Sequence, residues 1–178
     1  MPTWICLLRA VNLGSHNKVP MAGLRDALSA HGFRDVRTYV QSGNVVLSST
    51  VRSESKVSDA VRSVLVSEFD VDTPVLVRTP RELADVVAWD PFPEDSASRP
   101  QHVYVVHLDA VPDVDRAASV LAQDWSPDGL ALRGRELVVR YDDSLSNSRV
   151  KQPQVLRRLG TDGTARNWRT LRALHDLT

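Results

Sequence analysis

The sequence predicts an α+β fold made of two ferredoxin-like halves in tandem, the second of them degenerate and followed by a C-terminal helix. In the first half, the pattern predicts strand, helix, strand, strand, helix, strand, which is the split βαβ arrangement. The first five of these elements recur in the second half. Between them, residues 90–101 (DPFPEDSASRPQ) contain three prolines and no periodicity. The expected domains are therefore residues 1–89, a linker or lid at 90–101, and residues 102–178.

Residues 4–11 (WICLLRAV) form a nearly continuous apolar run, which predicts a central strand covered on both faces. The polar segment 12–19 then predicts a loop, and Pro20 suits the first turn of a helix. Apolar residues at helical spacing indicate that helix: Met21, Leu24, Ala27 and Leu28.

Residues 36–48 (VRTYVQSGNVVLS) contain two β-rich runs on either side of Ser42, Gly43 and Asn44. Glycine permits a positive φ, and serine and asparagine form local hydrogen bonds, so this stretch predicts a hairpin with an uncharged polar tip. A helix at about residues 54–69 and a short edge strand at 74–77, which starts with proline, complete the first half.

The second half begins with an apolar strand at residues 103–108. Asp113 is expected to cap a helix whose inward residues are Val114, Ala117, Ala118 and Leu121. A second hairpin follows, with strands at residues 130–132 and 137–141. A short helix of one to two turns then ends at residues 159–160. Residues 161–164 predict a loop instead of a fourth strand, and a terminal helix is expected from Asn167 onward.

The composition is that of an ordinary globular protein, with 22 basic and 22 acidic residues and a net charge of zero. The single cysteine, Cys6, excludes an internal disulfide, and the five histidines show no metal-ligand spacing. No signal segment and no apolar run of about 20 residues is present. We therefore expect a cytoplasmic protein with no membrane association, cofactor or metal, and the oligomeric state stays open.

One candidate site follows from the predicted sheet. The first and third strands of a ferredoxin-like sheet are antiparallel neighbours, so the end of the first lies beside the hairpin tip. This brings together two cations and several amides: Arg9, Asn12, Lys18, Gln41, Ser42 and Asn44. Such a group suits a phosphate or a carboxylate. The equally weighted alternative is that these residues cap strand ends and hold the loop.

A basic cluster forms the second candidate. The segment from Arg149 to Arg172 contains seven cations and one acidic residue. Within it, Arg166, Arg169 and Arg172 recur every three residues, on the side of the predicted helix opposite Trp168. This spacing suits contact with a nucleic-acid backbone. A solvated helix face is the favoured alternative. The third strand also has no aromatic residue to stack a base, which argues against an RNA-recognition domain.

No catalytic residue can be named. The sequence contains neither a Gly-x-Ser-x-Gly elbow nor a glycine-rich phosphate loop, and His107 is expected to be a core histidine. An enzyme acting on a phosphorylated or acyl substrate at the hairpin tip is the third hypothesis.

Four motifs resemble the bacterial domain-of-unknown-function family numbered 1697. They are LLRAVN at residues 7–12, NKVPM at 17–21, QSGNV at 41–45 and RNW at 166–168. The resemblance implies a ferredoxin-like α+β architecture and no established activity. It adds Arg166 and Asn167 to the site. The sequence departs from the family pattern at Ala10, Ser15, His16 and Arg169, and the change at Ser15 and His16 removes one cation from the loop.

The leading hypothesis is a binding protein for a small anion of phosphate or nucleotide type, held at the hairpin tip between the halves. Arg9, Lys18 and Arg166 would neutralise its charge. The orienting residues would be Asn12, Gln41, Ser42 and Asn44. Nucleic acid is the less favoured partner.

Overall fold

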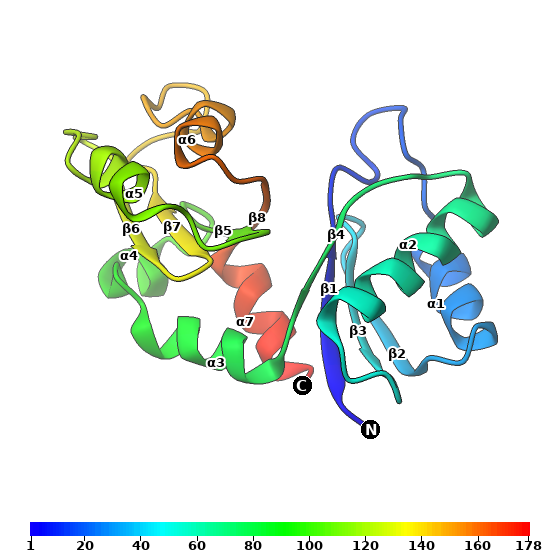
Figure 1. Ribbon diagram of the computed structural model, residues 1–178. Coiled ribbons are helices and arrows are strands. Elements are labelled where there is room, and N and C mark those ends of the chain that lie inside the picture. The colour runs from blue at the N-terminus through cyan, green and yellow to red at the C-terminus, as the bar shows by residue number, and fades with distance from the viewer. The chain divides into compact units, whose positions relative to one another are not determined.

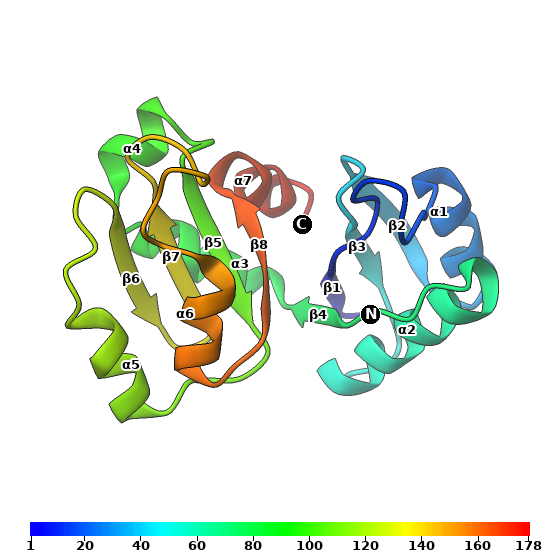
Figure 2. The same ribbon diagram turned by 90° about the horizontal axis from the view of Figure 1, so that it is seen from above.

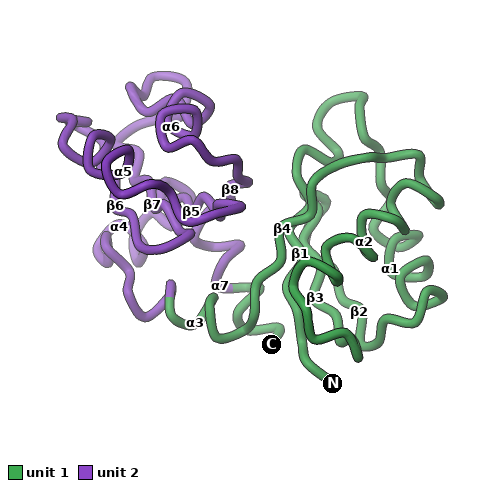
Figure 3. Tube along the Cα trace, in the orientation of Figure 1, with its two compact units in different colours: residues 1–85, 173–178 green, residues 86–172 purple.

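The computed structural model describes all residues of the chain, 1–178. They form two compact units (Figure 3). Unit 1 contains residues 1–85 and 173–178, and unit 2 contains residues 86–172. Each unit holds one four-stranded antiparallel sheet.

Unit 1 has the element order that the sequence predicts. Its elements are β1 (Thr3–Leu8), α1 (Met21–Ala30), β2 (Arg34–Tyr39), β3 (Asn44–Ser48), α2 (Glu54–Phe69) and β4 (Val75–Arg78). The strands lie in the order β2-β3-β1-β4. The predicted antiparallel pairing of the first and third strands is confirmed, with Leu7 opposite Asn44.

Both α1 and α2 cover one face of this sheet (Figure 1). Alternate β1 residues Trp4, Cys6 and Leu8 share one core with residues of the two helices: Leu24, Leu28, Val57, Val61 and Leu65. The intervening residues Ile5 and Leu7 are also buried. The continuous apolar run of β1 therefore corresponds to a strand that is buried on both faces.

Unit 2 repeats this arrangement. Its elements are α4 (Pro93–Ser98), β5 (Val103–Leu108), α5 (Val114–Leu121), β6 (Gly129–Arg133), β7 (Glu136–Arg140), α6 (Gln152–Leu159) and β8 (Gly163–Asn167). The strand order is β6-β7-β5-β8, which matches unit 1 position by position. Two further helices, α3 (Pro80–Trp89) and α7 (Trp168–Asp176), contain residues of both units.

The fourth strand of unit 2 corrects the prediction of a loop at residues 161–164 and of a degenerate half. β8 pairs antiparallel with β5 along its whole length. Its sequence, GTARN, has no large apolar residue, so no apolar run marks it as a strand. Glycine is needed at its start, since a Cβ on Gly163 would lie 2.6 Å from the carbonyl oxygen of His107.

The predicted inward face of α5 is wrong at Val114, Ala118 and Leu121, and of the four predicted residues only Ala117 packs against the core. Val114 is 80% exposed and Leu121 is 43% exposed, whereas Val120 is buried. Asp113 does cap the helix, accepting hydrogen bonds from two backbone N–H groups. Val120 packs against a core that α6 and β5 supply with Val106, Leu108, Val155, Leu156 and Leu159. Val120 and the half-buried Ala117 thus anchor this two-turn helix, and its other apolar residues are exposed.

The segment predicted as a linker or lid contains the helix α4 and belongs to unit 2. Arg99, just after α4, donates a hydrogen bond of 2.9 Å to the carbonyl oxygen of Asp142. Asp95 of α4 lies 3.5 Å from the Nε of Arg140 on β7. These contacts attach the segment to the second sheet, and a function as a lid stays a prediction. No helix in the chain is both long and apolar enough to cross a membrane.

Replacing Gly43 with alanine should destabilise unit 1. A Cβ there would lie 2.4 Å from Val11 Cγ2 and 2.8 Å from Leu8 Cβ, and φ is +78°. The steric clash should cost about 1–3 kcal/mol, and the left-handed backbone a further ~1–2 kcal/mol. Gly14→Ala is the matched control, because φ is +58° and nothing lies within 4 Å. Urea unfolding should show the larger loss at Gly43, and equal losses would contradict the packing argument.

Alkaline pH should destabilise each unit through a different buried group. Burial raises the pKa of the Cys6 thiol in unit 1 to about 12. Burial, with smaller contributions from Tyr104 and Asp128, raises the pKa of the Tyr141 hydroxyl in unit 2 to about 12. In the unfolded chain these groups ionise near pH ~8.5 and ~10. Their contribution to stability is therefore complete below those values and is lost as the pH rises toward the folded pKa values.

Two measurements follow this loss separately. Alkylation of Cys6 reports the opening of unit 1. The part of the phenolate absorbance that Tyr141→Phe lacks, compared with the wild-type chain, reports the opening of unit 2. Both signals should appear together with the loss of native circular dichroism. Rapid alkylation of Cys6 at pH 9 in a chain that keeps its native spectrum would contradict the prediction.

Candidate functional site

The turn between β2 and β3, residues 40–43, lies beside the end of β1 (Figure 2). Leu8, the last residue of β1, donates its N–H to the carbonyl oxygen of Gly43 at 2.8 Å. The segment that follows β1, residues 9–19, therefore starts at the hairpin tip. We call residues 9–19 and 40–44 the hairpin-tip site.

The Asn12 side chain joins the two parts of this site. Its Nδ2 donates one hydrogen bond to the carbonyl oxygen of Gln41 at 2.7 Å and another to that of Val19 at 2.9 Å. Its Oδ1 accepts from the N–H of Val19 at 2.8 Å. Asn12 has a φ of +55°, a conformation that asparagine tolerates better than most residues. Asn12 thus closes the loop and fastens it to the turn.

Asn44 holds the turn from the other side. It is fully buried, and its Nδ2 donates hydrogen bonds of 3.0 Å to the carbonyl oxygen of Tyr39 and to the hydroxyl of Ser42. The Ser42 and Gln41 side chains are exposed at the tip. The two asparagines therefore fix the backbone of the site, and Gln41 and Ser42 are the polar side chains that it presents to solvent.

The cations of the site lie on the loop after β1. Arg9 is half-buried, and its backbone bonds to residues 73 and 74, just before β4. Lys18 is exposed, directly before Val19. Neither segment of the hairpin-tip site contains an aspartate or a glutamate. The two segments therefore supply cations and no carboxylate to the site, within a chain whose net charge is zero.

Arg166 and Asn167 lie in unit 2, and their joining the hairpin-tip site stays a prediction. Arg166 is 7% exposed on β8. Its Nη1 donates to Thr164 Oγ1 at 2.8 Å and to the carbonyl oxygen of Ala165 at 2.9 Å. Burial lowers the pKa of Arg166 to about 10, so the guanidinium is still protonated at neutral pH. Asn167 accepts a hydrogen bond from the N–H of Thr170 and so caps α7.

His107 lies in the core, as the sequence predicts, beside a partner that the sequence does not indicate. His107 Nδ1 lies 2.6 Å from Oε2 of Glu136, and both side chains are buried. These residues are directly opposite each other on β5 and β7, and Thr164 of β8 is opposite His107 on its other side. With Arg166 they form a buried polar row on one sheet face. Only the strand register brings these residues together, so the sequence held no local signal for the row.

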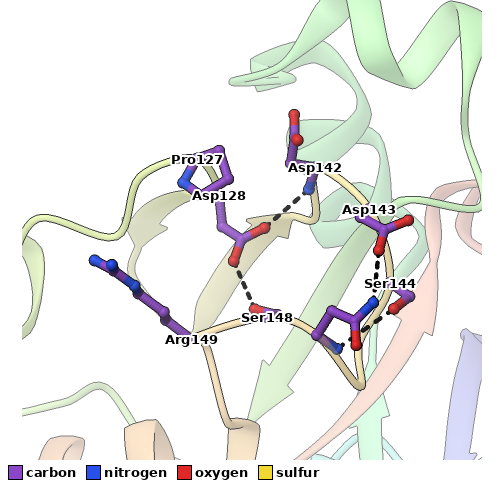
Figure 4. Close-up of a pocket in the computed structure, with 8 residues that line it drawn as sticks. Pro127, Asp128, Asp142, Asp143, Ser144, Ser148 and Arg149 are labelled. Atoms are coloured by element: carbon purple, nitrogen blue, oxygen red, sulfur yellow. Dashed lines mark hydrogen bonds between the residues drawn. The ribbon is translucent and has the colours of Figure 1, made fainter.

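A small pocket of about 110 Å³ lies between loops of unit 2 (Figure 4). The carboxylate of Asp128 accepts hydrogen bonds from the N–H of Asp142 at 2.9 Å and from the hydroxyl of Ser148 at 2.6 Å. Asp143 accepts from the Asn147 side chain at 2.8 Å. These acidic groups stabilise the loops around them and would repel an anion. No group of three or more His, Cys, Asp or Glu side chains is arranged to hold a metal ion.

The basic C-terminal cluster does not form the predicted stripe of three arginines. Arg166 belongs to β8 and is buried, whereas Arg169 and Arg172 are exposed on α7. Arg158 is also engaged within unit 2, with its guanidinium 5.7 Å from the ring centre of Trp125. The regular spacing of the three arginines is therefore a coincidence of sequence and does not reflect one helix face.

The family of this chain follows from a comparison with known protein families. The model of the family described as "Protein of unknown function (DUF1697)" matches residues 1–137. The chain belongs to this DUF1697 family. The match includes all of the hairpin-tip site and confirms the family that the sequence resembles, and it ends before the RNW motif at residues 166–168. No curated protein matches the chain.

A solved structure supports the fold. The chain is similar to a conserved bacterial protein from Streptococcus pneumoniae, with a TM-score of 0.75 and 19% sequence identity. The similarity covers 99% of this chain and 98% of that protein. At this identity the likeness concerns the mixed α+β fold alone.

Removing the Asn12 side chain should loosen the hairpin-tip site. Asn12→Gly keeps the positive φ accessible but loses three hydrogen bonds, at a cost of about 1–3 kcal/mol. Asn12→Asp should cost more, because a carboxylate would then face two carbonyl oxygens. Asn17→Gly is the matched control, since Asn17 has a φ of +49° and makes one such bond, to Ala10.

In thermal unfolding, Asn17→Gly should be the most stable of these variants, Asn12→Gly less stable and Asn12→Asp the least stable. Amide hydrogen exchange should speed up in residues 40–43 for both Asn12 variants. Equal stability of the two glycine variants, with unchanged exchange in the turn, would contradict a joining function of Asn12.

Proposed function

We propose that this protein binds a small anionic ligand of phosphate or nucleotide type at the hairpin-tip site of unit 1. One observation carries the proposal: a turn held on both sides by Asn12 and Asn44 presents polar groups beside a loop that carries Arg9 and Lys18. As part of the same proposal, each sheet with its covering helices is a ferredoxin-like half.

The charges of the site favour an anion. Its two segments contain two permanent cations and no carboxylate. A phosphate can accept charge-assisted hydrogen bonds from arginine and lysine, which are roughly twice as strong as neutral ones. The side chains of Gln41 and Ser42 add neutral donors at the tip.

Rigidity also supports a binding function. A ligand that meets a site already held by hydrogen bonds loses less free energy to ordering than one that must fold a flexible loop. In unit 1 that rigidity comes from the side-chain amides of Asn12 and Asn44. The side chains of Lys18, Gln41 and Ser42 are exposed to solvent around this fixed backbone.

The test is a thermal-shift screen of nucleotides, sugar phosphates, acyl-CoA and short oligonucleotides, followed by calorimetric titration of the best ligand. A ligand present at ~100 times its Kd should stabilise the chain by ~2.7 kcal/mol. Arg9→Ala and Lys18→Ala should each weaken binding about tenfold or more, since hydrogen bonds to a charged group contribute about 1.5–3 kcal/mol.

Lys56→Ala is the matched control for Lys18→Ala. Both lysines are exposed in unit 1, and both variants change the net charge equally. Lys56 lies in the first turn of α2, which follows the end of β3 remote from the hairpin tip. Its replacement should change Kd less than twofold. Equal Kd values for the wild-type chain and Arg9→Ala would overturn the proposed function.

A further inference from the structure

Val40, the first residue of the turn, has an unfavourable backbone conformation. Its φ is +51°, and β-branched residues adopt such values only at a cost. Hydrogen bonds hold the backbone on either side of it: Asn44 to the carbonyl oxygen of Tyr39, and Asn12 to that of Gln41. Strain that the surrounding structure imposes in this way is concentrated at ligand sites in proteins.

Packing within the chain offsets little of this cost. The Val40 side chain is 50% exposed. Asparagine or glycine would satisfy the same backbone without strain. The turn therefore holds an apolar side chain in solvent where a polar or absent one would make the folded chain more stable.

A second exposed apolar side chain adjoins the same hydrogen bond. Leu13 is 63% exposed and follows Asn12, just as Val40 precedes Gln41. Both are therefore one residue from the hydrogen bond that joins the loop to the turn. The two segments of the hairpin-tip site thus contain exposed apolar side chains as well as the cations Arg9 and Lys18.

We infer that the hairpin-tip site takes an organic phosphate that carries an apolar or aromatic group, of which a nucleotide base is one example. This inference rests on the proposed function and narrows its ligand class. The cations bind the phosphate, and Leu13 and Val40 cover the apolar part of the ligand. Burial of that part then repays, on binding, the cost of holding both side chains in water.

Two matched pairs of ligands test the inference by calorimetric titration. Phenyl phosphate is compared with glycerol phosphate, and a nucleoside monophosphate is compared with ribose 5-phosphate. The wild-type chain should bind the first member of each pair about fivefold or more tightly. Leu13→Ser and Val40→Asn should reduce this preference to within about twofold.

Two further measurements separate a specific contact of Leu13 and Val40 with the ligand from a general effect of replacing an exposed apolar residue with a polar one. Val66→Ser is the matched control, because Val66 is a 45% exposed residue on α2 of the same unit, and it should keep the preference. Val40→Asn should also raise Tm by about 4 °C, because it relieves the strained backbone. A lower Tm for Val40→Asn would contradict the strain argument.

The outcomes distinguish the two proposals. Equal affinity within both ligand pairs, or a preference that survives in Leu13→Ser and Val40→Asn, would overturn the inference and leave the anion site standing. Absence of phosphate binding, or binding that Arg9→Ala leaves unchanged, would overturn the proposed function and this inference with it.

Discussion

The hydrogen bonds of the Asn12 side chain are the constraint on which the hairpin-tip site depends. One short amide joins the loop after β1 to the β2–β3 turn through Val19 and Gln41. Sheet pairing alone places β1 beside β3 only as far as Gly43. Beyond that point Asn12 holds the loop against the turn, and Asn44 fixes the turn itself. The charged loop and the polar tip therefore form one surface.

The two units contain sheets of the same strand order, but the hairpin-tip site of unit 1 and the polar groups of unit 2 differ in charge. In unit 1 the loop after the first strand carries cations without acids. In unit 2 the buried row pairs His107 with Glu136, and the loops near Asp128 are acidic. A shared topology thus supports different chemistry, because the loops and the exposed faces are free to vary. This contrast favours unit 1 as the location of an anion site.

The parts of the fold that the sequence predicted are those with local signals. β1 is a continuous apolar run, and the β2–β3 turn contains Ser-Gly-Asn. β8 could not be predicted in this way, because GTARN becomes a strand only through its pairing with β5. The residues gathered at the hairpin tip followed from topology, since antiparallel pairing places them together. The local hydrogen bonds of Asn44 are those expected of the turn. The bonds of Asn12 to Gln41 and Val19 could not be predicted, because they depend on the left-handed backbone of Asn12.

The central claim is that an organic phosphate binds unit 1 at the hairpin tip. A titration followed by ¹⁵N–¹H correlation spectra tests it most directly, with phenyl phosphate added to the isotope-labelled full chain. The amide shifts that saturate with ligand should be largest in residues 9–19 and 40–44. Saturating shifts that are largest in unit 2, for example around Asp128 or along β8, would contradict it, as would a spectrum that stays unchanged.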